Sequence, residues 1–302
     1  MTEGLVSVIV PTYGGGKYIS RTVDSVLNQT YPHVEVVVVD DNGVGTENQL
    51  KTEKEMLRYA NDKRVKYVCH EVNINGAAAR NTGVKNSDGE FIGLLDDDDI
   101  YHPDKIQKQV EMLKSLDESY GVTYCSNEVY RDDTKVSEAH VYKDGYVFGD
   151  IMQSAIQICT PSLLMRRTAY EGIGGFDETF RRHQDLEFMV RLTNKYKAKS
   201  MDFIGFRIYI TNRNSARSYE QAREWMEHYL GAMEPYINQL PPKIRKDIHI
   251  YRRLDAMFNL LKEKRYAEYI KEYFKLHPGY RGIVSFYPKF AYHIKNKLGI
   301  SQ

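Results

Sequence analysis

Short apolar runs alternate with helical patterns over the first hundred residues of the chain. The runs Leu5–Val10 and Val34–Val39 have the length of strands that are buried on both faces of a parallel sheet. Between them, apolar residues recur at the spacing of one helix face over Lys17–Asn28. Further elements are predicted at Thr46–Ala60 (helix), Val65–Cys69 (strand), Gly76–Lys85 (helix) and Glu90–Leu95 (strand). This order predicts a parallel sheet with right-handed crossovers and with helices on its faces.

The regular alternation ends near residue 99. Beyond it we expect Pro103–Leu116 (helix), Gly121–Cys125 and Val129–Arg131 (strands), Gly145–Ile158 (irregular), Pro161–Met165 (strand), and Arg166–Tyr170 and Asp185–Tyr196 (helices). From about Ser215 the pattern is helical to the end. We therefore predict an α/β domain at residues 1–215, with a Rossmann-like, mixed but mainly parallel sheet flanked by helices, and a helical region at residues 216–302. In the polar helix over Thr46–Ala60, we expect Leu50, Met56 and Leu57 to face the core.

Composition narrows the class of protein. Of the 302 residues, 42% are hydrophobic and 27% are charged, a balance that excludes disordered and fibrous chains. No apolar run approaches the roughly 18 residues of a transmembrane helix. The first residues lack the basic start of a secretory signal. Three scattered cysteines, Cys69, Cys125 and Cys159, form neither a disulfide framework nor a zinc spacing, so we expect buried thiols in a cytoplasmic protein.

Charge is unevenly distributed. The net charge is +1, but residues 241–302 hold 14 Lys and Arg against 5 Asp and Glu. The body is therefore acidic and the C-terminal region is basic, and aromatic residues lie among its basic side chains: Tyr251, Phe258, Tyr266, Tyr269, Tyr273, Phe274, Tyr280, Phe286, Tyr287, Phe290 and Tyr292. Such a region can attach to an anionic inner leaflet. The alternative is a helical subdomain that packs its aromatic residues on the catalytic domain. No nucleic-acid motif is present, and no nucleic-acid partner is expected.

Polar and aromatic residues stand where three of the predicted strands end. These ends are Pro11-Thr12-Tyr13, Asp40-Asp41-Asn42-Gly43 and Asp96-Asp97-Asp98-Asp99. Ligands of such sheets bind beyond the carboxyl ends of the strands. We therefore expect an aromatic ring, a carboxylate pair and a carboxylate run to share one crevice.

The four consecutive aspartates predict a metal site. Adjacent carboxylates repel one another unless a cation neutralises them. Mn²⁺ or Mg²⁺ typically takes one or two carboxylates together with substrate phosphates. The alternative is an acidic turn that caps the helix after Pro103. One aspartate suffices for a cap, so we favour the metal and expect Asp99 to be the member that only caps.

The ordered set of motifs resembles family 2 glycosyltransferases. The resemblance runs over about residues 4–210 and rests on Val6-Ser7-Val8-Ile9-Val10-Pro11-Thr12-Tyr13, Val36–Asp41, Asn75-Gly76-Ala77-Ala78-Ala79-Arg80-Asn81-Thr82-Gly83, Asp88–Asp99, Gly174-Gly175-Phe176-Asp177-Glu178 and Gln184-Asp185-Leu186-Glu187. It implies the GT-A fold and an inverting, metal-dependent transferase of the hexosyl or N-acetylhexosaminyl type. Its donor would be a nucleotide sugar, and its acceptor a glycan or a lipid-linked hydroxyl in the synthesis of a bacterial surface polysaccharide.

The resemblance also assigns the donor site. Pro11, Thr12 and Tyr13 would line the nucleotide, with the Tyr13 ring stacked on the base unless that ring is a core aromatic. Asp41 would accept a hydrogen bond from a ring N–H, which favours uridine over cytidine and hence a UDP-sugar. Asp40 would only brace the turn. Arg80 would reach the base or the diphosphate, the alternative being a surface ion pair.

The carboxylates of the later motifs would carry the chemistry. In the Asp-x-Asp motif, Asp98 would contact the metal, with Asp96 as a further ligand, and Asp96 or Asp97 would contact the ribose or the sugar. Asp185 would be the general base that takes the proton from the acceptor hydroxyl, and it could also cap its helix. The family commonly has Glu where this chain has Gln184, which puts acceptor recognition in doubt rather than catalysis.

A Rossmann dinucleotide fingerprint is excluded, because it would need a third glycine where Ile19 stands. Two rival interpretations remain at the level of sequence. A nucleotidyltransferase of similar fold would also use acidic metal ligands, and Gly14–Lys17 faintly resembles its glycine-rich first loop. A non-catalytic nucleotide-binding module would keep Tyr13 and Asp41 and could dispense with Asp185.

Overall fold

The computed structural model describes residues 1–276 except 15, 157 and 211–216. By their internal contacts the residues divide into two compact units, Met1–Arg213 and Asn214–Gln302. Each unit is described by itself.

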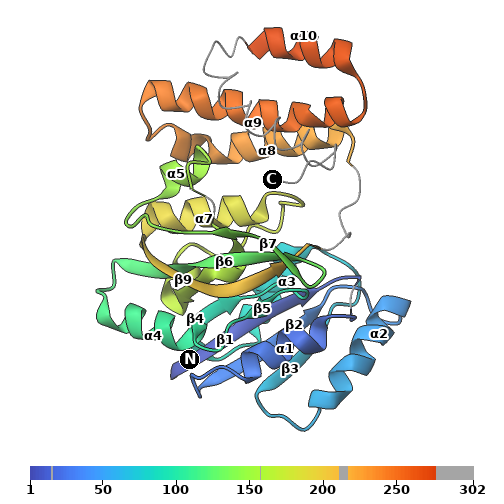
Figure 1. The fold of residues 1–302 in the computed structure, drawn as a ribbon, viewed down its shortest axis with the longest axis vertical. Coiled ribbons are helices and arrows are strands. Elements are labelled where there is room, and N and C mark those ends of the chain that lie inside the picture. Colours follow the sequence, from blue (N-terminus) through green and yellow to red (C-terminus); the bar gives the residue numbers. More distant parts are fainter. Residues whose placement is uncertain (15, 157, 211–216, 277–302) are drawn as a thin grey trace. The chain divides into compact units, whose positions relative to one another are not determined.

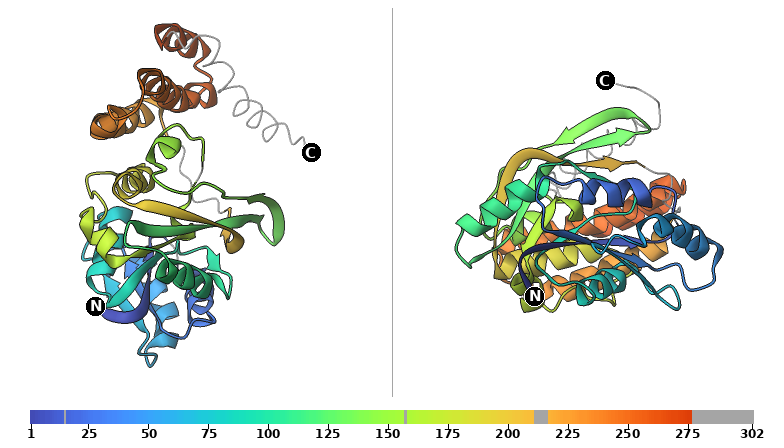
Figure 2. Two further views of the ribbon diagram at one scale, coloured as in Figure 1. Left: turned by 90° about the vertical axis from the view of Figure 1, so that its left-hand side faces the viewer. Right: turned by 90° about the horizontal axis from the view of Figure 1, so that it is seen from below.

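The first unit is built on one mixed sheet (Figure 1). Its parallel half has the order β3-β2-β1-β4, with β1 (Thr2–Thr12), β2 (Val34–Asp40), β3 (Val65–Cys69) and β4 (Gly89–Leu94). The order continues as β4-β8-β6-β9-β5, with β5 (Ile100–Tyr101), β6 (Tyr120–Arg131), β8 (Leu163–Arg166) and β9 (Lys197–Tyr209), while β7 (Thr134–Ala139) pairs with β6. Antiparallel pairing predominates in this second half, although β6 and β9 are parallel. Figure 2 shows the β6–β7 hairpin, in green, extending from the sheet.

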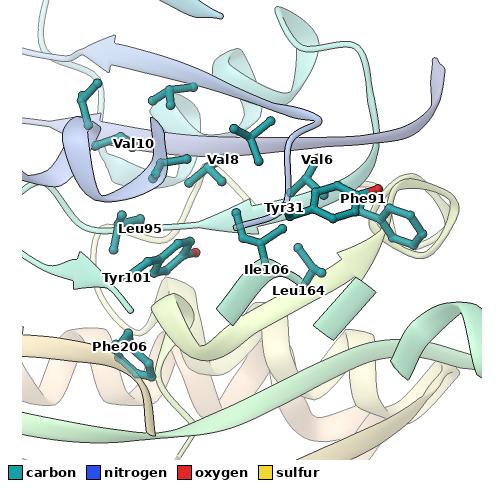
Figure 3. Close-up of a cluster of buried hydrophobic side chains, with 14 of the residues drawn as sticks. Val6, Val8, Val10, Tyr31, Phe91, Leu95, Tyr101, Ile106, Leu164 and Phe206 are labelled. Carbon is teal, nitrogen blue, oxygen red and sulfur yellow. The ribbon is translucent and has the colours of Figure 1, made fainter. Parts of the chain in front are cut away.

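Helices flank this sheet. They are α1 (Ile19–Leu27), α2 (Glu47–Met56), α3 (Gly76–Lys85), α4 (Lys105–Ser115), α5 (Phe148–Met152), α6 (Arg167–Gly172) and α7 (Gln184–Lys195). Successive side chains of a strand point to opposite faces, so β1 serves two helices. Val6, Val8 and Val10 join the core cluster that contains α1 (Figure 3). Ile9 points the other way and lies so close to Gly83 of α3 that a Cβ there would meet its side chain at 2.2 Å.

The predicted fold class is confirmed, and three local predictions are wrong. Met56 is buried as predicted, but Leu50 and Leu57 are 55% and 66% exposed, and Gln49 and Thr52 are buried instead. The phase of α2 is set by its start, where Thr46 accepts a hydrogen bond from the Gln49 N–H. The two strands expected at 121–131 are the single strand β6, and the segment expected to be irregular at 145–158 contains α5.

The cysteine prediction is correct only in part. Cys125 is buried, but Cys69 and Cys159 are partly exposed. All three are free thiols. Burial raises the pKa of the Cys125 thiol to about 11, so this side chain stays protonated at neutral pH.

The second unit consists, in its described part, of α8 (Tyr219–Ile237), α9 (Pro242–Lys262) and α10 (Tyr266–Leu276). Tyr219, Leu254, Met257 and Leu260 form its core, and Tyr269, Tyr273 and Leu276 of α10 pack against it. The aromatic residues of the basic region beyond Leu276, for which membrane attachment or packing was predicted, lie outside the described residues. No helix in the described part of the chain is long and apolar enough to cross a membrane.

Candidate active site

The ends of β2, β1 and β4 are neighbours in the sheet, as the sequence predicted. Thr12 pairs with Asp40 in the ladder between β1 and β2. Its hydroxyl donates to the Asp97 carboxylate at 2.5 Å, which joins the end of β1 to the aspartate run. Pro11, one residue earlier, is partly buried opposite Val39.

Tyr13 lies at the end of β1 with 62% of its surface exposed. The alternative that it is a core aromatic is therefore wrong. The next residue, Gly14, has φ of +70° and donates its N–H to the Asn42 side chain at 2.6 Å. The loops after β1 and β2 are thus joined beside an exposed ring.

The two carboxylates after β2 have separate surroundings. Asp40 is fully buried and accepts hydrogen bonds from the Asn42 N–H, the Asn42 side chain and the Tyr67 hydroxyl, so it braces the turn. Asp41 is 3% exposed and accepts from His70 Nδ1 at 2.7 Å, Asn73 Nδ2 at 2.8 Å and the Ile74 N–H at 2.9 Å. Sequence reasoning missed His70 and Asn73, because no spacing rule joins them to Asp41.

Buried and part-exposed side chains alternate in the aspartate run. Asp97 and Asp99 are 7% and 3% exposed, whereas Asp96 and Asp98 are partly exposed. The Thr22 hydroxyl lies at 3.0 and 2.8 Å from the carbonyl oxygens of Asp97 and Asp99. Arg21 donates to the carbonyl of Asp98 at 2.7 Å, so two side chains of α1 fix the backbone of this turn by hydrogen bonds.

Asp99 does not cap the following helix. Its carboxylate accepts the Tyr209 N–H of β9 at 3.0 Å, while α4 begins after Asp104. Burial first of all, and then the charges of Asp96 and Asp98, raise the pKa of Asp99 well above its usual value. The residue therefore joins β9 to the aspartate run, which sequence reasoning could not foresee.

Asp96 receives a charged partner from α3. Arg80 Nη2 lies 2.9 Å from its carboxylate. Loss of hydration raises the pKa of Asp96, and Arg80 opposes this shift, while the charges of Asp98 and Asp185 add to it. The same guanidinium reaches the Gln184 side-chain oxygen at 3.4 Å and the Gly76 carbonyl at 3.2 Å. Arg80 is thus in an ion pair with the part-exposed Asp96, and the same guanidinium bridges the aspartate run and α7.

Asp185 lies exposed in the first turn of α7. The N-cap residue is His183 in a left-handed conformation, and its side chain makes no capping hydrogen bond. Burial first, and then the charge of Asp185, raise the pKa of Cys159 to about 12, and the charge of Asp185 also acts on Asp96, so the three side chains share one neighbourhood. An exposed carboxylate beside this cluster is suited to accept a proton.

A clamp on the glycine loop before α7 was not predicted. The Asn81 side chain of α3 bonds both the carbonyl and the N–H of Phe176 at 2.9 Å, and also Glu178 at 2.7 Å. Arg191 of α7 donates to the carbonyls of Ile173 and Gly175 at 2.6 and 2.8 Å. The loop is therefore fixed between α3 and α7, and the Arg80 guanidinium lies over its Phe176 ring, 5.4 Å from the ring centre.

The donor set at the aspartate run fits a hard divalent ion. Within the described residues, no group of three or more His, Cys, Asp and Glu side chains could hold a metal by itself. Asp96 and Asp98 are the carboxylates that the turn leaves partly exposed. Mn²⁺ and Mg²⁺ commonly take one or two carboxylates and complete their coordination with water and phosphate oxygens.

This chain is similar to known glycosyltransferases in sequence and in fold. The family model described as glycosyl transferase family 2 matches residues 7–174. The amylovoran biosynthesis glycosyltransferase AmsB of Erwinia amylovora is 27% identical, and the match covers 82% of this chain and 81% of AmsB. TarS 1–349 of S. aureus, solved in complex with UDP-GlcNAc, superposes with a TM-score of 0.62 at 18% identity, covering 92% of this chain and 91% of TarS 1–349. The mannosyltransferase PcManGT of Pyrobaculum calidifontis, solved with GDP-Man and Mn²⁺, gives 0.58 at 18% identity, covering 98% and 88%.

Proposed function

We propose, from the premise that this chain belongs to glycosyl transferase family 2 and has its GT-A fold, that it transfers a sugar from a UDP-sugar to an acceptor hydroxyl with inversion. The observation that carries the proposal is the junction at Arg80, which joins the aspartate run to the helix that bears Asp185. The UDP-GlcNAc complex of TarS supports a UDP-linked hexose or N-acetylhexosamine. The similarity to AmsB, a glycosyltransferase of amylovoran biosynthesis, supports an acceptor in polysaccharide biosynthesis, either a glycan or a lipid-linked intermediate.

In this proposal the strand ends bind the nucleotide. The exposed Tyr13 ring stacks on the base, Pro11 and Thr12 line its edge, and Asp41 accepts a ring N–H. Asp96, or Asp97 whose carboxylate accepts the Thr12 hydroxyl, contacts the ribose or the sugar.

In this proposal the diphosphate of the donor binds beside the part-exposed carboxylates of Asp96 and Asp98. Asp98, with Asp96, would hold Mn²⁺ or Mg²⁺, and PcManGT in its complex with Mn²⁺ supports this assignment. When bound, the ion would neutralise charge on the departing nucleoside diphosphate. Arg80 pairs with Asp96 and opposes the rise in the pKa of Asp96 that burial causes, and it adds positive charge to this side of the site.

Asp185 accepts the proton of the acceptor hydroxyl. As the bond between C1 and the diphosphate oxygen breaks, the hydroxyl oxygen bonds to C1 from the opposite face, and the proton goes to the Asp185 carboxylate. One displacement inverts the anomeric carbon, and UDP leaves. A nucleotidyltransferase would instead release pyrophosphate, and a non-catalytic module would release no UDP from a UDP-sugar.

UDP should stabilise the protein only when Mn²⁺ or Mg²⁺ is present. Ligand at about 100 times its dissociation constant adds roughly 2.7 kcal/mol to the free energy of unfolding. Thermal unfolding with UDP, CDP, GDP and ADP, each with and without Mn²⁺, measures this effect. Equal stabilisation by all four nucleotides, or by UDP with EDTA present, would contradict the assigned donor site.

We further propose that the basic C-terminal region attaches the protein peripherally to the cytoplasmic face of the membrane. On α10, Tyr266, Ile270 and Phe274 follow one another at helical spacing and are 58%, 54% and 66% exposed. Lys271 and Lys275 are exposed on the adjoining side of the helix. An apolar stripe with flanking lysines fits an anionic lipid surface, and residues 241–302 carry the charge to reach it.

The variant Ile270→Ser/Phe274→Ser should bind anionic vesicles roughly tenfold more weakly than the wild type, because it loses the apolar contacts of the stripe. Co-sedimentation with phosphatidylglycerol-containing vesicles and with phosphatidylcholine vesicles measures both contributions. Leu50→Ser/Leu57→Ser removes exposed leucines from α2 and from the 3₁₀ turn that follows it, and it serves as the matched control. Binding that is unchanged in the α10 variant would exclude this stripe as the contact.

A further inference from the structure

A buried chain of hydrogen bonds runs from Asp41 to helix α3. His70, which follows β3 and is 9% exposed, places Nδ1 2.7 Å from the Asp41 carboxylate. Its other ring nitrogen, Nε2, lies 2.9 Å from the hydroxyl of Thr82 on α3. In the arrangement that uses every hydrogen, Nδ1–H donates to Asp41 and the Thr82 hydroxyl donates to Nε2.

This arrangement leaves Asp41 with limited capacity for a ligand. A carboxylate has about four acceptor positions. His70 and the Ile74 N–H both bond Oδ1, and Asn73 bonds Oδ2. One position therefore remains on Oδ2, and the carboxylate cannot turn without losing the contacts on Oδ1.

We propose that His70 is a positioning residue that fixes the Asp41 carboxylate, so that its remaining acceptor position selects a nucleobase with a ring N–H. The inference rests on the proposed donor site. Uracil carries an N–H at ring position 3, whereas cytosine has an acceptor lone pair there, which a fixed carboxylate repels. A carboxylate free to rotate could turn away from the mismatched base, and the selection would weaken.

The hydrogen bonds that start at Asp41 end at Thr82 on α3, the helix that also carries Arg80. Thr82 holds His70, while Arg80, two residues earlier, pairs with Asp96. The base-selecting carboxylate and the carboxylate assigned to the diphosphate side are therefore positioned by one helix. A substitution of Thr82 should therefore alter the selection of the base through His70 and Asp41, although Thr82 itself is not assigned a contact with the nucleotide.

Binding of UDP, CDP and pyrophosphate to the full-length protein in Mn²⁺, measured by calorimetry, tests the proposal. In His70→Leu we expect the preference for UDP over CDP to fall about tenfold, as expected when an oriented charged hydrogen bond is lost. Affinity for pyrophosphate should stay within twofold of wild type. His70→Gln offers an amide N–H to Asp41 and should restore most of the preference, which a general loss of packing would not allow.

Two further variants keep the result interpretable. Thr82→Val removes only the hydroxyl and should lower the preference for UDP over CDP about threefold. This variant still tests the hydrogen-bond chain from Asp41 to Thr82 if His70→Leu does not fold. His140→Gln changes an exposed histidine that also pairs with carboxylates, Asp202 and Glu138, and should have no effect. Wild-type protein that binds UDP and CDP equally would overturn the UDP-sugar assignment and this inference together. A wild-type preference that persists in His70→Leu and Thr82→Val would overturn this inference alone.

Discussion

Asp185→Asn should slow the release of UDP from the donor sugar by about 10³-fold, within the range that a general base contributes. The amide keeps the size of the side chain and removes its capacity to accept the proton. Because Asp185 is exposed and is assigned neither to the metal nor to the nucleotide, metal-dependent UDP affinity should stay within about twofold of wild type. Single-turnover UDP release, with the UDP-sugar that stabilises the wild type most, measures the first effect and calorimetry the second.

Asp117→Asn is the matched control. This exposed aspartate follows α4 and accepts the Ser119 N–H, and its substitution makes the same chemical change away from the strand ends. Full turnover in Asp185→Asn would show that another group takes the proton. Loss of UDP affinity in the same variant would instead assign Asp185 to donor binding.

The parallel half of the sheet could be predicted because its strands are continuous apolar runs. Every residue of β2 is buried, and burial on both faces leaves no polar alternation that could mislead. Strand β9 offers no such signal. Its 13 residues include Lys197, Lys199, Asp202 and Arg207, and its partners β6 and β5 are distant in sequence.

Buried polar residues explain the remaining errors in the fold. Ser126 and Glu128 look like a break between two strands, yet both are buried within β6. Ser126 bonds Asp202, and Glu128 accepts from His102 and Arg207. In α2, Gln49 is buried because its side chain accepts the Gly45 N–H. A sequence pattern cannot show which polar side chains will find such partners.

The same limit applies to the candidate site. The strand-end rule correctly brought Tyr13, Asp41 and the aspartate run to adjoining strand ends. It could not tell which aspartates turn inward, because that depends on Thr12, Tyr209 and other distant partners. The contact of Arg80 with Gln184 spans 104 positions of the chain, and it gives the unusual glutamine a partner that a spacing rule cannot supply.

Asp98→Asn should abolish the stabilisation by UDP that depends on Mn²⁺ and weaken UDP binding about 100-fold or more. In the proposed site Asp98 supplies a carboxylate oxygen to the ion, and an amide is a far weaker ligand for a hard divalent cation. The side chain is partly exposed, so the substitution should change the free energy of unfolding of the unliganded protein by less than about 0.5 kcal/mol. Thermal unfolding with Mn²⁺ alone, UDP alone and both together separates these effects.

Asp97→Asn provides the contrast within the same run. Asp97 is 7% exposed and accepts the Thr12 hydroxyl, so its substitution acts first on a buried hydrogen bond. We expect it to lower the free energy of unfolding by about 1–3 kcal/mol while the protein still requires Mn²⁺ to bind UDP. If Asp97→Asn lost the metal dependence and Asp98→Asn kept it, the alternation of buried and part-exposed side chains would have assigned the metal ligand to the wrong aspartate.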